Sequence, residues 1–195
     1  MNIESIPEVY TLIAENDDAE LRQKFLNNVN FREYEKYIDS IVYVPNRWKS
    51  NMAVHTTRIR IFNRHRKGEK SQIRVFPPAF TTHRTLDDFL GTLIYHEGYH
   101  AREVCEVPEL IIPTMAEIFV ESLKEIKFNP WSFLFGPRYF SPRAAAAEIR
   151  AIRNELENSP FNKPLYGRRM ELEMALDHCS KFVKSFPHVE PLPAL

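Results

Sequence analysis

The stretch H-E-G-Y-H at residues 96–100 constrains this chain more than any other, because the pattern H-E-x-x-H has a defined geometry only on a helix. Residues four apart on an α-helix lie on one face, about one turn apart. The flanking sequence favours that helix: Thr85 suits an N-cap, two acids follow in the first turn, and Pro108 ends the helical spacing. We therefore expect a helix over residues 85–106 that presents both histidines on the same side.

Two imidazole rings one turn apart can bind one Zn²⁺ ion, and zinc lowers the pKa of a bound water to roughly 7. A neighbouring carboxylate can then take the proton of that water. Glu97 falls within the apolar stripe of the predicted helix, where a carboxylate is costly unless it is paired or close to a metal. An alternative interpretation is that His96 and His100 are hydrogen-bonded core residues and that Glu97 pairs with Arg102 or Arg143.

The segment 86–106 resembles the HExxH helix of the zincin metallopeptidases. That resemblance implies that His96 and His100 are zinc ligands and that Glu97 is the general base. It also implies hydrolysis of a peptide bond in a peptide or protein substrate, with Zn²⁺ as the cofactor.

A catalytic zinc of this kind has a third protein ligand, which must come from elsewhere in the chain. The metzincin branch continues its motif as H-E-x-x-H-x-x-G-x-x-H, but Glu103 replaces the glycine here and Glu106 replaces the last histidine. Without that glycine the chain cannot easily turn residue 106 back to the metal. The gluzincin branch instead takes a glutamate from a following helix.

Glu148 is the residue that we predict as the third ligand. Ser141-Pro142 is an N-cap followed by proline at the first helical position, which predicts a helix over residues 142–158. Glu148 lies on the flank of its apolar stripe, beside Ala144 and Ala151. Small neighbours allow the close helix packing that a short carboxylate needs to reach a metal. The pattern Glu148-x-x-Ala151 also resembles the second motif of small gluzincin-like proteins.

Other acids and histidines stay open as ligands, and Glu148 itself could be a surface charge on an alanine-rich helix. Glu155 lies on the same helix face and could be the ligand or an outer partner. A second helix, predicted over residues 114–127, turns its glutamates away from its apolar face. The alternatives are Glu155, Glu121, Glu106 and His178, with Asp177 beside the last of these.

The fold class that we predict is α+β, as one zincin-like domain over residues 1–195, mainly helical with a short three-stranded sheet before the HExxH helix. The N-terminal part is helical and breaks at the polar clusters 16–18 and 27–28. Residues 70–76 are the expected exposed edge of the sheet, which could bind an extended peptide. The expected parts are 1–40 (helical), 41–80 (sheet, strands at 41–44, 54–62 and 73–76), and helices at 85–106, 114–127, 142–158 and 166–184.

Composition favours a cytoplasmic protein without a membrane segment. The chain is 44% hydrophobic and 27% charged with zero formal net charge, and no apolar run approaches 18 residues. The N-terminus lacks the basic and apolar regions of a secretory signal. Cys105 and Cys179 show no metal-binding spacing and are expected to be reduced.

The favoured function is a zinc-dependent peptidase; the oligomeric state stays open. The alternative is a catalytically idle zincin-fold binding protein with a structural metal site. Residues 54–74 could form a basic hairpin that contacts nucleic acid or an acidic partner, although strand edges carry such charges routinely and we do not favour nucleic acid. The aromatic segment 128–140 could cover a cleft or form a separate small core. The basic residues of the hairpin are Arg58, Arg60, Arg64, Arg66, Lys67, Lys70 and Arg74.

Overall fold

The computed structural model describes residues 7–45, 53–56, 68–83, 85–108, 142–162 and 166–184. Within these ranges the fold is α+β and mainly helical, as predicted. The predicted helix 114–127 and the aromatic segment 128–140 lie outside them. The elements are α1 (Pro7–Glu15), α2 (Ala19–Leu26), η2 (Arg32–Tyr37), β1 (Ile38–Tyr43), β2 (Ala53–Thr56), β3 (Ser71–Val75), α3 (Pro77–Thr82), α4 (Leu86–Leu90), η3 (Gly91–Glu97), α5 (Gly98–Glu106), α8 (Pro142–Asn158), η5 (Pro160–Asn162) and α9 (Tyr166–Lys184).

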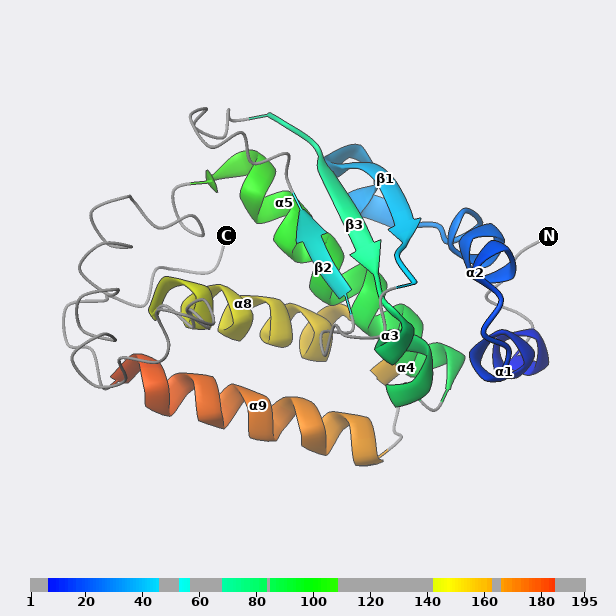
Figure 1. Ribbon diagram of the computed structural model, residues 1–195. Helices are drawn as coiled ribbons and strands as arrows, with labels where there is room; N and C mark the ends of the chain where they lie inside the picture. The colour runs from blue at the N-terminus through cyan, green and yellow to red at the C-terminus, as the bar shows by residue number, and fades with distance from the viewer. Residues whose placement is uncertain are drawn as a thin grey trace, which may run out of the picture.

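The sheet has the strand order β1-β3-β2 and lies against one side of the HExxH helix (Figure 1). Its parallel part is the two-stranded pair of β1 and β3, whereas β2 runs antiparallel to β3. The prediction that residues 70–76 form the exposed edge is wrong, because β3 is bonded on both sides. Alternating burial along β3 shows which face packs on the core, but that pattern is the same for an edge strand and a central strand.

The HExxH helix is continuous from Leu86 to Glu106 and consists of α4, η3 and α5; we call it the motif helix. Thr85 caps its start as predicted, since its Oγ1 accepts a hydrogen bond from the backbone N–H of Asp88 at 3.1 Å. Its middle part, Gly91–Glu97, is π-helical. There the backbone bonds reach one residue further than in an α-helix, an irregularity that is frequent at functional sites.

An aromatic cluster fixes the N-terminal end of the motif helix to the N-terminal helices. Tyr10 of α1, Phe25 of α2, Phe80 of α3 and Phe89 of α4 are all buried. Their ring centroids lie 5.0 to 6.4 Å apart in tilted, stacked and edge-on pairs. The N-terminal end of the motif helix is therefore anchored by aromatic packing against α1, α2 and α3.

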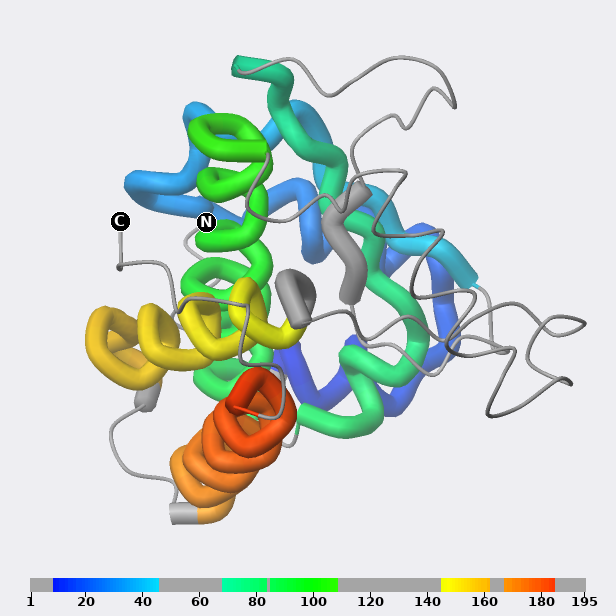
Figure 2. The backbone as a smooth tube through the Cα atoms, turned by 90° about the vertical axis from the view of Figure 1, so that its left-hand side faces the viewer, coloured from blue at the N-terminus to red at the C-terminus, as the bar shows by residue number. Residues whose placement is uncertain are grey.

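Helices α8 and α9 pack side by side, and α8 crosses the motif helix on the side that the sheet leaves open (Figures 1 and 2). Their bounds agree with the helices predicted over 142–158 and 166–184. Among the residues that the structure describes, no helix combines the length and the apolar character that crossing a lipid bilayer requires. The crossing of α8 over the motif helix positions the site.

Candidate metal centre

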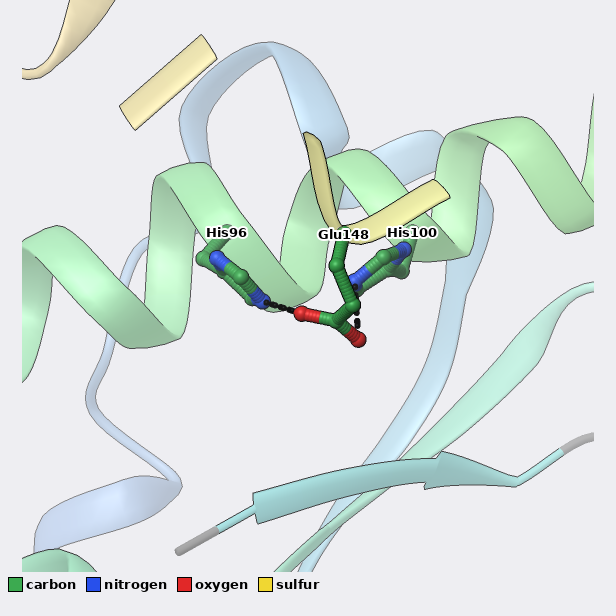
Figure 3. Close-up of side chains that lie close together, drawn as sticks. All are labelled: His96, His100 and Glu148. Carbon is green, nitrogen blue, oxygen red and sulfur yellow. Dashed lines mark ion pairs between the residues drawn. The ribbon is translucent and has the colours of Figure 1, made fainter. Parts of the chain in front are cut away.

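His96, His100 and Glu148 come together where α8 crosses the motif helix. Figure 3 shows the Glu148 carboxylate between the two imidazole rings. Glu148 Oε2 lies 3.1 Å from His96 Nε2, and Glu148 Oε1 lies 3.4 Å from His100 Nε2. One ligand atom from each of the three residues lies within 4.8 Å of the others. This group can hold a metal ion, with two nitrogen donors from one helix and oxygen donors from another.

Small side chains let α8 approach the motif helix closely enough to bring Glu148 to the histidines. Ala145, Ala147 and Ala151 are all buried, and they occupy the turns before and after Glu148. Larger residues at these positions would hold the two helices apart. Of the two small neighbours predicted beside Glu148, Ala151 is fully buried where α8 contacts the motif helix, and the side chain of Ala144 lies outside the described residues.

Without a metal, protons balance the charge of this group. Burial disfavours a charged His100, but the carboxylates of Glu103 and Glu148 outweigh that cost and raise the pKa of His100 to about 10. Burial likewise disfavours a charged Glu148, yet hydrogen bonds from His100 and His96 hold the pKa of Glu148 well below its usual range. A protonated His100 therefore faces the ionised carboxylate of Glu148 in the metal-free protein.

Each histidine also has a second carboxylate behind it, on its Nδ1 side. Glu155 Oε2 lies 3.6 Å from Nδ1 of His96, and Glu103 Oε2 lies 3.9 Å from Nδ1 of His100. Both of these carboxylates are fully buried. Distances of 3.6 and 3.9 Å are longer than a hydrogen bond, so these carboxylates act on the two imidazoles mainly through their charge.

An arginine accompanies each of these outer carboxylates. Arg168 of α9 lies 3.1 Å from Glu155, and Arg150 of α8 forms an ion pair with Glu103. Buried charges of one sign are costly unless they are paired, so the two arginines make the outer carboxylates tolerable. Each imidazole ring therefore has Glu148 on its Nε2 side and an outer carboxylate, paired with an arginine, on its Nδ1 side.

Glu97 is buried beside the same group, as its place in the apolar stripe predicted. Burial raises the pKa of Glu97, and the charges of Glu148 and Glu155 add to that rise. His96 and His100 counteract it, but the net effect is a higher pKa for Glu97. A carboxylate with a raised pKa is a better proton acceptor near neutral pH than an ordinary glutamate. Its electrostatic neighbours are the metal-binding group and the outer carboxylate Glu155.

The backbone around the motif is held by two contacts that the sequence did not reveal. A Cβ atom added to Gly98 would lie 2.9 Å from Cγ of Tyr34, so glycine permits η2 to pack directly on the motif. Asn154 Nδ2 donates to the carbonyl oxygen of Tyr95 at 2.7 Å and to the Tyr34 hydroxyl at 2.8 Å. These contacts fix the residue immediately before His96.

The other candidate ligands are placed elsewhere or lie beyond the described residues. Glu106 accepts hydrogen bonds from Tyr37 and Arg102, so Arg102 is engaged by Glu106. His178 is exposed on α9, and its neighbour Asp177 is exposed and pairs with Lys181. Glu121 lies outside the described residues, as do most of the basic hairpin and the side chain of Arg143.

Sequence reasoning missed the roles of Glu103, Arg150 and Arg168. A signal was present for Glu103, because a glutamate three residues after His100 on the same helix lies on a neighbouring face. No comparable signal existed for Arg168, whose partner lies on another helix. Arginines on a helix are usually exposed, and nothing in the local pattern distinguishes one that turns inward.

No protein-family model, curated protein or solved structure matches this chain. The function must therefore be inferred from the geometry of the site itself.

Proposed function

We propose that this protein is a zinc-dependent peptidase of the gluzincin type, with His96, His100 and Glu148 as the metal ligands and Glu97 as the general base. The observation that carries the proposal is the placement of Glu148 between the Nε2 atoms of both histidines, at 3.1 and 3.4 Å. These three residues lie on two different helices, so the group exists only when α8 packs against the motif helix.

The donor set fits zinc. Two imidazole nitrogens and one carboxylate are a set of ligands that Zn²⁺ takes in catalytic sites, where a fourth position is left for water. Softer thiolate ligands are not part of the group, which contains only nitrogen and oxygen donors. The cationic charge that the site requires is supplied by protons in the metal-free protein, and a divalent cation is the natural replacement.

Glu97 is the residue proposed to move the proton. Zinc bound at this group would lower the pKa of a bound water to roughly 7 and would polarise a substrate carbonyl. Glu97 is adjacent in sequence to His96 and buried, and its raised pKa suits it to accept a proton and then return it to the leaving amine. A purely structural metal site has no need for such a residue.

The edge of β2 is the proposed binding place for an extended peptide. β2 is bonded to β3 on one side, contacts the π-helical part of the motif helix, and is the terminal strand in the described sheet order. A terminal strand presents backbone N–H and C=O groups that can pair with a peptide as an added strand. This edge replaces residues 70–76, which the sequence had indicated.

The test is cleavage of fluorescence-quenched peptides of mixed sequence and of fluorescein-labelled casein by protein loaded with one equivalent of zinc. The Glu97→Gln variant is expected to bind zinc like the wild type and to lose hydrolysis by about 10² to 10⁴-fold. His96→Ala is expected to lose both zinc and hydrolysis. Glu157→Gln, an exposed glutamate on α8, is the control and should retain both.

Two results would contradict the proposal. Wild-type protein that binds zinc but cleaves neither probe would remove the peptidase assignment and leave a metal-binding protein. Undiminished hydrolysis in Glu97→Gln would remove the general base.

A further inference from the structure

We propose that Arg168 of α9 is a positioning residue for the metal centre, and that it acts on His96 through the buried carboxylate of Glu155. This inference rests on the proposed metal site and deepens it, because it makes the docking of α9 a determinant of metal affinity.

The contacts form a chain from α9 to the metal ligand. Arg168 Nη2 lies 3.1 Å from Oε1 and 3.3 Å from Oε2 of Glu155, and Arg168 Nε lies 3.3 Å from Oε1. Glu155 Oε2 in turn lies 3.6 Å from Nδ1 of His96. The Nε2 atom on the other side of the same ring faces Glu148.

Thr92 holds the same carboxylate from the motif helix. Its Oγ1 lies 3.4 Å from Glu155 Oε1 and accepts a hydrogen bond from Arg168 Nη2 at 2.5 Å. Thr92 lies one turn before His96 in the π-helical segment. Three elements, namely the motif helix, α8 and α9, therefore converge on one carboxylate behind His96.

The physical reason for the arrangement is the cost of a fully buried carboxylate. The Glu155 side chain is 0% exposed, whereas that of Arg168 is 13% exposed. An isolated buried carboxylate is costly, and the guanidinium beside Glu155 offsets that cost and fixes the direction of the carboxylate. The Glu155 carboxylate lies on the Nδ1 side of the His96 ring, and its position favours the ring orientation in which Nε2 faces Glu148.

The outer carboxylate behind His100 comes from a different helix than the one behind His96. The outer carboxylate of His100 is Glu103 on the motif helix itself, paired with Arg150 of α8. The support of His96 includes α9, through the ion pair of Arg168 with Glu155. Exposed residues make up much of α9, and Leu172, Cys179 and Val183 are its buried apolar side chains. The ion pair of Arg168 with Glu155 therefore links the position of α9 to His96.

The experiment compares the zinc dissociation constants of Arg168→Met and Arg169→Met, measured by competition with a chromogenic chelator. Arg169 is the adjacent residue, is exposed, and pairs with the exposed Glu173 at 2.9 Å, so it is a matched control. We expect Arg168→Met to weaken zinc binding by about 10 to 100-fold and Arg169→Met to leave it unchanged. Arg168→Lys keeps the positive charge but loses the planar set of N–H donors of the guanidinium, so its zinc dissociation constant should be intermediate.

A double-mutant cycle separates positioning from general destabilisation. Glu155→Gln alone should weaken zinc binding to a similar degree, and Arg168→Met should add little in its presence, because both changes break the same chain. The visible absorption of bound Co²⁺ should shift in both single variants and stay the same in Arg169→Met. Because Glu155→Gln tests the same chain, the proposal stays testable if Arg168→Met does not fold.

The outcomes distinguish the inference from the proposed function. If Arg168→Met and Glu155→Gln bind zinc as the wild type does while His96→Ala loses it, the positioning role is overturned and the metal centre stands. Fully additive effects of the two changes would overturn the role as well. If wild-type protein binds no zinc, the proposed function and the inference fall together.

Discussion

Glu148 Oε2 lies 3.1 Å from Nε2 of His96, although the two residues lie on different helices and are 52 positions apart in the sequence (148 − 96). The contact depends on the crossing of α8 over the motif helix, and buried alanines of α8 are compatible with a close approach of the two helices. The packing of two helices is therefore the direct cause of the metal-binding group. Predictions about this packing and about the group can be tested separately.

Replacing Glu148 with glutamine should weaken zinc binding more than any change in the outer carboxylates. An amide lacks the negative charge and the second equivalent oxygen, so we expect the dissociation constant to rise by more than about 100-fold, the upper end of outer-partner effects. Isothermal titration with a competing chelator measures it. Glu157→Gln on the same helix should bind zinc normally, and equal affinities for the two variants would exclude Glu148 as a ligand.

Gly98→Ala should destabilise the protein although alanine favours helix. The new Cβ would lie 2.9 Å from the ring of the buried Tyr34, which Asn154 holds in place. Overpacking of this kind costs about 1 to 3 kcal/mol, whereas the gain in helix propensity is at most about 1 kcal/mol. Urea unfolding should show a net loss of free energy, and Gly167→Ala is a control because a Cβ added there would have no atom within 4 Å. A more stable Gly98→Ala variant would show that Tyr34 moves freely.

Asn154→Ala should cost about 1 to 3 kcal/mol of unfolding free energy, because it removes the donor that the Tyr95 carbonyl and the Tyr34 hydroxyl share. Glu157→Ala, at an exposed position on the same helix, should change the unfolding free energy by no more than about 0.5 kcal/mol. Chemical denaturation of both variants measures the difference. Equal effects would mean that the contact of Asn154 with the motif helix contributes nothing to stability.

The lowered pKa of buried His83 predicts that the folded protein loses stability in acid. Burial, together with the charges of Arg168 and His96, lowers the pKa of His83 to about 3 from its ordinary value of 6.5. The unfolded chain therefore binds a proton more readily than the folded one between these values. The contribution of neutral His83 is complete above pH 6.5 and is lost as pH falls towards 3, at no more than about 1.4 kcal/mol per pH unit.

The measurement is the unfolding free energy of wild type and His83→Gln at several pH values between about 4 and 7, the window in which the two states differ in protonation. The wild type should lose stability more steeply than the variant as pH falls, because the carboxylates titrate in both proteins and cancel in the difference. Identical slopes would show that His83 gains its proton as easily in the folded protein as in the unfolded one.

Local patterns predicted the elements that carry the site. Thr85 and Pro108 limit the motif helix, and Ser141-Pro142 precedes α8, because caps and prolines act on neighbouring residues alone. Glu148 was predicted from the alanines around it, since side-chain size controls how closely helices approach. The burial of Glu97 followed from its place in the apolar stripe.

Features that depend on contacts between distant segments were not predictable in the same way. The central place of β3 requires pairing with both β1 and β2, and alternation along one strand contains no information about its neighbours. The π-helical part of the motif helix was not predicted either, because the apolar spacing around Gly91–Glu97 also fits an ordinary α-helix. The ion pair of Arg168 with Glu155 joins two helices whose separate patterns give no sign of it.

The X-ray absorption spectrum of zinc-loaded protein at the zinc edge tests the metal centre most directly. One zinc per wild-type chain is predicted, with scattering from two imidazole rings and from oxygen at about 2.0 to 2.2 Å, whereas His100→Ala, like His96→Ala, should not retain stoichiometric zinc. A spectrum without imidazole scattering, or one that is the same in His100→Ala, would contradict a metal ion held by His96, His100 and Glu148.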